Sequence, residues 1–129
     1  MMKIKDIHHV AILTDNYEVS KKFYTEVLGF KIIAETYREE RNSYKLDLAI
    51  NGTYQIELFS FPDYRERGSY PESKGLRHLA FTVDNVESSV VFLKTNNIDV
   101  QEVRIDELTG KKFVFFIDPN GQPLELYES

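Results

Sequence analysis

The sequence predicts an α+β protein built from two βαβββ modules in tandem. Three observations predict this class: an internal repeat, a regular alternation of strand-like and helix-like segments within each copy, and a polar segment between the copies. When the chain is laid over itself, "HVAILTDNYEVSKKFY" (9–24) matches "HLAFTVDNVESSVVFL" (78–93), and seven of the sixteen positions are identical. Such self-similarity indicates one supersecondary unit used twice. The identical pairs are His9/His78, Ala11/Ala80, Asp15/Asp84, Asn16/Asn85, Glu18/Glu87, Ser20/Ser89 and Phe23/Phe92.

The first module is expected at residues 5–60 and begins with a strand and a helix. "IHHVAIL" is rich in β-branched and apolar residues, which is typical of a strand. Asp15 followed by Glu18 is a variant of the capping box and predicts a helix from about residue 16. Val19 and Phe23 begin a four-residue spacing, continued by Val27, that predicts the buried stripe of this helix. Gly29 then stands where a glycine commonly ends a helix.

Three strands are predicted after the helix in each copy. In the first copy they lie near residues 30–38, 44–50 and 53–60, and the Asn51-Gly52 pair predicts a hairpin turn between the last two. The second copy repeats the pattern with a strand at 76–83, a helix at 85–96 and strands near 98–105, 112–117 and 122–128. "DPNG" (118–121) predicts the last turn, with proline second and glycine fourth.

The segment 61–75 separates the two modules, so that the second module spans 76–129. It reads "FPDYRERGSYPESKG", with two prolines, two glycines and charges of both signs, which is typical of a linker or flap. We therefore expect one domain of two modules, each with a sheet that packs its helix on one face.

Composition excludes several classes of function. The chain has 129 residues, 42% of them hydrophobic, and a net charge of −5. The scattered basic residues and the acidic balance argue against a nucleic-acid partner. There is no cysteine, so any metal must be held by His, Asp or Glu. The N-terminus has no signal-like apolar region and no stretch is long enough to span a bilayer, so we expect a cytoplasmic protein without a membrane partner.

Of the two adjacent histidines, the second is the candidate for function. Alternation along the first strand places His9 on one face with Ala11, and His8 on the other face. In the repeat, His9 matches His78, whereas His8 matches Arg77. The position retained in both copies is therefore that of His9.

Two carboxylates also recur in the repeat, within apolar strands. After a one-residue slip, "IELF" (56–59) falls on "LELY" (124–127), so Glu57 matches Glu125. An unpaired carboxylate buried in such a strand is costly. Two imidazoles and two carboxylates at matching places would suit one divalent cation that accepts nitrogen and oxygen ligands. The alternative is that each side chain is a packed or edge residue, because a repeat can preserve packing as well as chemistry.

The residues "HHVAI", "RHLAF", "IELF" and "DPNGQPLEL", set in paired βαβββ modules, resemble the vicinal oxygen chelate superfamily. Within it they are most similar to bacterial glyoxalase I and small glyoxalase-family proteins, over about residues 5–128. The resemblance implies half-barrel sheets around one divalent metal, Ni, Zn, Co or Mn. It implies as ligands His9, Glu57, His78 and Glu125. Glu125 would be the base, with Glu57 as the alternative.

The resemblance also implies a reaction and an assembly. The reaction is that of a lactoylglutathione lyase, in which a proton is abstracted from the hemithioacetal of an α-ketoaldehyde and a small thiol. The assembly is a homodimer with its sites at the interface, each site taking one module from each subunit. The alternatives are an acyl-thioester epimerase that uses the same proton abstraction, and a non-catalytic module for small-molecule binding or resistance.

The substrate-contacting residues are indicated less directly. Arg38 and Arg41 lie in "YREERNSYK", and Arg65 and Arg67 lie in the segment between the modules. Their guanidinium groups could hold the carboxylates of a thiol cofactor through paired hydrogen bonds. Because each arginine lies among acidic residues, the alternative is a solvated surface position.

Overall fold

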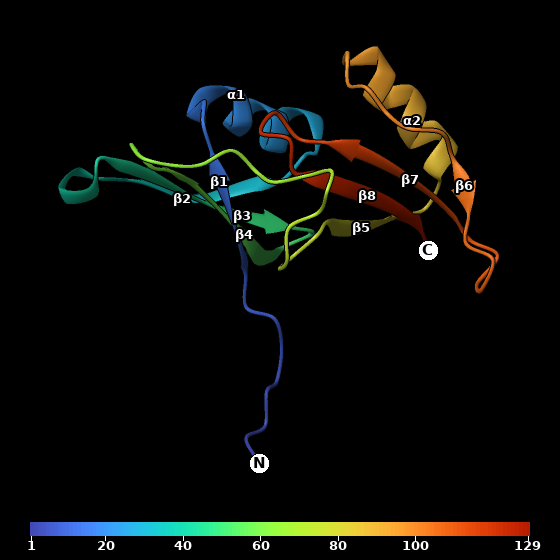
Figure 1. Ribbon diagram of the computed structural model, residues 1–129, viewed down its shortest axis with the longest axis horizontal. Helices are drawn as coiled ribbons and strands as arrows, with labels where there is room; N and C mark the ends of the chain where they lie inside the picture. Colours follow the sequence, from blue (N-terminus) through green and yellow to red (C-terminus); the bar gives the residue numbers. More distant parts are fainter. The chain divides into compact units, whose positions relative to one another are not determined.

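The computed structural model describes residues 1–129 and divides into two compact units, Met1–Arg65 and Glu66–Ser129. Each unit contains one four-stranded sheet, and Figure 1 labels the strands. The strand orders are β1-β4-β3-β2 and β5-β8-β7-β6. In both sheets the first and last strands of the unit are parallel neighbours and the remaining pairs are antiparallel. The identical topology confirms the predicted pair of βαβββ modules.

The first unit follows the predicted order of elements closely. The Asn51-Gly52 turn between its last two strands has positive φ at both residues, 49° and 83°, as a two-residue hairpin turn requires. Its elements are β1 (Val10–Thr14), α1 (Tyr17–Lys22), the π-helical turn η1 (Phe23–Val27), β2 (Lys31–Arg38), the 3-10 turn η2 (Glu39–Arg41), β3 (Ser43–Ile50) and β4 (Thr53–Ser60).

The second unit differs from the prediction in one strand. The strand expected over residues 98–105 is reduced to two residues, preceded by an isolated bridge between Val100 and Phe116. Between that bridge and the pairing of Arg104 with Phe113, the segment 100–104 has one residue more than the β7 segment 113–116 opposite it. The ladder is therefore broken as in a bulge. The elements are β5 (Leu79–Val83), α2 (Val86–Thr95), β6 (Arg104–Ile105), β7 (Lys112–Ile117) and β8 (Pro123–Glu128).

Both helices begin at an asparagine of the repeat rather than at the preceding aspartate. Asn16 Oδ1 accepts a hydrogen bond from the Val19 backbone N–H at 3.3 Å, and Asn85 Oδ1 accepts one from Ser88 N–H at 2.8 Å. The capping box predicted from Asp15 was therefore displaced by one residue, because asparagine satisfies the free N–H groups of the first turn equally well. No helix in the structure is long and apolar enough to cross a bilayer.

The buried stripe of the first helix also differs from the prediction. Phe23 is buried, but Val19 is 47% exposed, and Tyr17, Ser20 and Tyr24 complete the buried face. The chain widens to a π-helical turn, in which Leu28 N–H donates to the carbonyl oxygen of Phe23. The extra residue per turn shifts the inward-facing positions away from a strict four-residue spacing. Gly29, with φ of 77°, ends the helix as predicted.

Each unit has its core between the helix and one face of the sheet. In the first unit the most buried strand residues are Leu46, Leu48, Ile56 and Leu58. In the second unit they are Val114, Phe116, Leu124 and Leu126. Burying one such side chain contributes about 1.5–3 kcal/mol. The opposite face of each sheet carries the candidate functional residues and packs against no helix of its own unit.

Candidate functional site

The two glutamates singled out by the repeat occupy equivalent positions in their sheets. In the first sheet Ala11 of β1 pairs with Glu57 of β4, and in the second sheet Ala80 of β5 pairs with Glu125 of β8. Ala11 and Ala80 are themselves a repeat pair. The parallel strands therefore have the same register in both modules, and this register places the two glutamates at equivalent positions.

Each unit brings its histidine and its glutamate together. His9 Nε2 lies 3.4 Å from Glu57 Oε2, and His78 Nε2 lies 3.3 Å from Glu125 Oε1. The glutamate side chains are 10% and 12% exposed, whereas the histidine side chains are 36% and 30% exposed. We call these two pairs the half-sites. Each presents one imidazole nitrogen and one carboxylate on the uncovered face of its sheet.

The residue before each of these histidines contacts its other ring nitrogen. His8 Nδ1 lies 2.8 Å from His9 Nδ1, and Arg77 Nη1 lies 3.1 Å from His78 Nδ1. A guanidinium group can only donate, so Nδ1 of His78 is the acceptor. The partner imidazole of His8 can either donate or accept, so it is compatible with both tautomers of His9. His8 and Arg77, which match in the repeat but differ in residue type, thus each contact Nδ1 of the histidine that follows.

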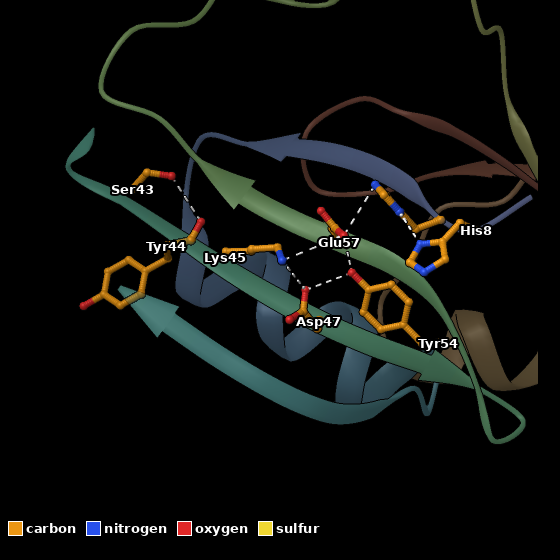
Figure 2. Close-up of polar contacts among 8 residues, drawn as sticks. His8, Ser43, Tyr44, Lys45, Asp47, Tyr54 and Glu57 are labelled. Carbon is orange, nitrogen blue, oxygen red and sulfur yellow. Dashed lines mark hydrogen bonds and ion pairs between the residues drawn. The ribbon is translucent and has the colours of Figure 1, made fainter. Parts of the chain in front are cut away.

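Glu57 lies in a polar cluster formed by two adjacent strands, shown in Figure 2. The hydroxyl of Tyr54 donates to Glu57 Oε2, and it also lies 3.1 Å from Asp47 Oδ1. Lys45 Nζ lies 3.4 Å from Asp47 Oδ1 and 3.9 Å from Glu57 Oε2. Burial, followed by the hydrogen bonds to Glu57 and Asp47, raises the pKa of Tyr54 well above its usual value. Tyr54 therefore remains a protonated donor at neutral pH.

Glu125 has aromatic rather than polar surroundings. Its antiparallel neighbour is Phe115, in the ladder position that Asp47 occupies beside Glu57. The ring of Phe115 meets the ring of His78 edge to face, with centroids 4.9 Å apart. The guanidinium of Arg104 lies over the Phe115 ring, 5.6 Å from its centroid. The two half-sites therefore share their imidazole and carboxylate but differ in what surrounds the carboxylate.

The donor set suits a divalent cation, although each unit alone supplies an incomplete set. Imidazole nitrogen and carboxylate oxygen are ligands that Zn, Ni, Co and Mn accept. In each half-site the imidazole and the carboxylate already lie on the same side of the sheet, with their closest nitrogen and oxygen atoms within 3.4 Å of each other. No group of three or more such side chains converges in the chain. A four-ligand site would therefore need two half-sites.

The arginines predicted as substrate contacts lie in different surroundings. Arg38, at the end of β2, stacks over Phe59 at 4.8 Å and donates from Nη2 to Ser43 Oγ at 2.9 Å. It is therefore packed rather than free in solvent, and its Nε is buried without a partner. Arg41 is exposed in the turn η2. In the intervening segment, Arg65 is exposed and Arg67 donates to the carbonyl oxygen of Arg77 at 2.7 Å.

The polar neighbours of Glu57 were missed by sequence reasoning. The Asn-Gly turn pairs Ala49 with Tyr54, but between that pair and the next the register shifts by one residue, so that Leu48 pairs with Ile56 and Asp47 with Glu57. A hairpin without this bulge would pair Asp47 with Ile56. The alternation in "YKLDLAI" does signal that Lys45 and Asp47 share a face, but the bulge decides which strand residue they meet.

Comparison with known proteins identifies close relatives along almost the whole chain. One family model, described as the Glyoxalase/Bleomycin resistance protein/Dioxygenase superfamily, matches residues 6–126. The protein YwkD of Bacillus subtilis is 58% identical over 127 residues, covering 98% of this chain and 99% of YwkD. YaeR of Escherichia coli is 53% identical over 128 residues, covering 99% of each. The crystal structure of a glyoxalase family protein from Enterococcus faecalis superimposes with a TM-score of 0.90 at 47% identity, covering 98% of this chain and 100% of that one.

More distant relatives carry named activities. A lactoylglutathione lyase of Schizosaccharomyces pombe is 29% identical over 147 residues, which cover 97% of this chain and 48% of that enzyme. The metallothiol transferase FosB of Staphylococcus epidermidis is 30% identical over 130 residues, covering 96% of this chain and 84% of FosB. The two closer relatives, YwkD and YaeR, are described as uncharacterized.

Proposed function

The chain belongs to the glyoxalase/bleomycin resistance/dioxygenase superfamily, and on that basis we propose that it is a divalent-metal-dependent lyase or isomerase of the glyoxalase I type. The substrate is the hemithioacetal of an α-ketoaldehyde with a small thiol. The observation that carries the proposal is the pair of His–Glu half-sites at equivalent positions of the two sheets, with nitrogen-to-oxygen distances of 3.4 Å and 3.3 Å.

The proposed metal ligands are His9, Glu57, His78 and Glu125, two from each module. A bound cation would supply positive charge to two neighbouring oxygens of the substrate, which would make the proton on the adjoining carbon more acidic. The carboxylates are nearly buried, so a cation would also offset the solvation that they lose. The fit of the donor set, rather than the family alone, supports this assignment.

Glu125 is the proposed base. Its only polar side-chain contact is with His78, so the carboxylate can turn toward a substrate carbon, accept its proton and return it to the neighbouring carbon. Glu57 is the alternative, but its Oε2 is already engaged by Tyr54, His9 and Lys45. A carboxylate held by three partners is less free to turn toward a substrate carbon than one with a single polar partner.

The proposed working unit is a homodimer in which each site takes one half-site from each subunit. Since each half-site has two ligands, completing the site requires a second module, and a two-fold axis would create two equivalent sites at once. In the first sheet, apolar β2 residues such as Ile33 are half-exposed, as expected for a surface that is covered in an assembly.

The experiment combines metal reloading with a proton-transfer assay. The full-length protein, reloaded separately with Ni, Zn, Co or Mn, is given methylglyoxal with a panel of small thiols. We expect thioester formation with at least one metal, and incorporation of solvent deuterium at the carbon that is reprotonated if the base exchanges its proton. Glu125→Gln should lose most turnover but keep much of its metal. Wild-type turnover in that variant rules out Glu125 as the base.

An epimerase would use the same proton abstraction on a different substrate. A 2-epi-5-epi-valiolone epimerase of Actinomyces is 26% identical over 93% of this chain. We therefore include a 2-substituted acyl thioester in the substrate panel and follow its racemisation in deuterated water. Turnover of that substrate without turnover of any hemithioacetal would replace the lyase assignment by the epimerase. Binding without turnover of either substrate would indicate a non-catalytic module.

A further inference from the structure

The neighbours of Glu57 indicate that the two glutamates have different tasks. Resting on the proposed function, we propose that Tyr54 is a positioning residue: its hydroxyl holds Oε2 of Glu57, so that Glu57 serves as a fixed metal ligand. Glu125, which lacks such a neighbour, keeps the freedom to move a proton.

The backbone sets up this contact through the irregularity in the hairpin of β3 and β4. The register shift between the Ala49–Tyr54 and Leu48–Ile56 pairs leaves one extra residue, Gln55, on β4. A bulge re-aims the side chains beside it. Here it brings Tyr54, three residues before Glu57, over the same face of the sheet, as Figure 2 shows.

The hydrogen bond and both ion pairs of Glu57 fall on one of its two oxygens. Tyr54, His9 and Lys45 each approach Oε2. Oε1 takes part in none of these contacts. A hydrogen-bond donor on one carboxylate oxygen fixes the plane of the group and leaves the other oxygen, in a defined direction, for a cation. This is how outer partners of metal ligands commonly act, by fixing the orientation of the ligand.

The arrangement is costly without such a role. Asp47 and Glu57 are directly paired across β3 and β4, and like charges in that position destabilise a sheet. Lys45 and the Tyr54 hydroxyl, which lies between the two carboxylates, offset the repulsion. An apolar residue opposite Glu57 would avoid the cost, and the second sheet has this solution, with Phe115 opposite Glu125.

The second half-site has no equivalent of this donor. Pro123 of β8 pairs with Ile117 as Tyr54 pairs with Ala49, and a proline side chain has no hydrogen-bond donor. The amide of the preceding residue, Gln122, donates to the backbone carbonyls of Arg77 and Pro123. The nearest tyrosine along β8, Tyr127, gives its hydroxyl to Asp106. His78 is therefore the one polar side chain that contacts the Glu125 carboxylate.

The test measures metal affinity in the full-length protein. Co²⁺ is titrated against a chromogenic chelator, and the dissociation constant is compared for wild type, Tyr54→Phe and the control Tyr37→Phe. Tyr37 is on the same sheet, but its hydroxyl donates to Asn42 in the turn after β2. We expect Tyr54→Phe to weaken Co²⁺ binding by about 10-fold or more, as the loss of an outer partner commonly does. Tyr37→Phe should bind as wild type does.

A double-mutant cycle separates positioning from a general loss of stability. If Tyr54 acts through Glu57, then Tyr54→Phe should have little further effect on Co²⁺ affinity once Glu57→Gln is present. Urea unfolding of the metal-free proteins reports the structural contribution separately. The same 10-fold loss in both backgrounds, or an unchanged dissociation constant in Tyr54→Phe, overturns the positioning role. Absence of Co²⁺ binding in wild type would overturn the proposed metal site itself, and the positioning role with it.

Discussion

Replacing Lys45 by methionine would show whether the polar cluster at Glu57 is built for a cation. The ammonium group lies 3.4 Å from Asp47 Oδ1 and 3.9 Å from Glu57 Oε2. Methionine keeps most of the length of the side chain and removes its charge. In the metal-free protein the two facing carboxylates would then lose the positive charge between them.

The distances give the expected size of the effect. At 3.4 Å a pair of unit charges is worth about 1.2 kcal/mol at the dielectric constant of water, and about 5 kcal/mol at an effective value near 20. The Lys45 side chain is about one-third exposed (32%), so solvent screening favours the lower end of that range. We expect Lys45→Met to lower the free energy of unfolding of the metal-free protein by about 1–2 kcal/mol.

A bound cation should reduce that loss. Because the cation would neutralise Glu57 itself, Lys45 matters less in the metal-bound protein, and linkage then requires the variant to bind metal more tightly. If the bound form loses about 1 kcal/mol less than the metal-free form, the Co²⁺ dissociation constant falls about five-fold. The assay is urea unfolding with and without saturating Co²⁺, together with the chelator titration. The expected tighter binding of Co²⁺ by Lys45→Met is opposite to the weaker binding expected for Tyr54→Phe.

The matched control is Lys112→Met in the second unit. Lys112 pairs with Glu87, a helix residue that belongs to neither half-site. Its replacement should leave Co²⁺ affinity unchanged. If Lys45→Met binds Co²⁺ as weakly as Tyr54→Phe does, or if its stability loss is the same with and without metal, the electrostatic reasoning is refuted.

Three further predictions concern stability and assembly. The hydrogen bonds from Lys21 and then Tyr17 hold the pKa of Glu35 below its usual value, so these contacts stabilise the fold above about pH 4.5 and are lost as pH falls through the lowered pKa. Urea unfolding should show a shallower loss of stability in acid for Glu35→Gln than for wild type, and equal slopes would contradict this. Asn85→Ala should lower the free energy of unfolding by about 1 kcal/mol through loss of the helix cap, with Asn85→Asp as the control that keeps a cap. For the proposed dimer, the His9→Ala and Glu125→Gln proteins are mixed under subunit exchange. Half of the dimers should then be mixed, each with one of its two sites intact, so about a quarter of wild-type activity should return. No recovery of activity would mean that both half-sites of each site come from one chain.

The repeat explains why so much of the fold could be predicted. Its two copies pointed to the same succession of elements, one strand, a helix and three strands, and the Asn-Gly pair and Gly29 identified a real turn and a real helix end. Local irregularities could not be predicted. The helix cap is Asn16 rather than Asp15, and Val19 of α1 faces solvent, because several local geometries satisfy the same backbone groups at similar cost.

The site was predictable where the repeat marked it and obscure elsewhere. His9 and Glu57 were paired in the sequence by their counterparts in the second copy. Asp47, Lys45 and Tyr54 have no counterpart of the same type, and their meeting with Glu57 depends on the one-residue register shift in the hairpin. A bulge changes which residues face one another without changing the hydrophobic pattern on which the prediction rests.

Metal analysis of the full-length protein, purified without chelators, tests the central claim most directly. We expect about one divalent metal per chain in wild type and in His8→Ala, because His8 meets His9 on its Nδ1 side and is not one of the proposed ligands. His9→Ala and His78→Ala should each lose stoichiometric metal, since each removes one of the four proposed ligands. Full metal occupancy in the His78→Ala protein, or none in wild type after reloading with Ni, Zn, Co and Mn in turn, would contradict the account.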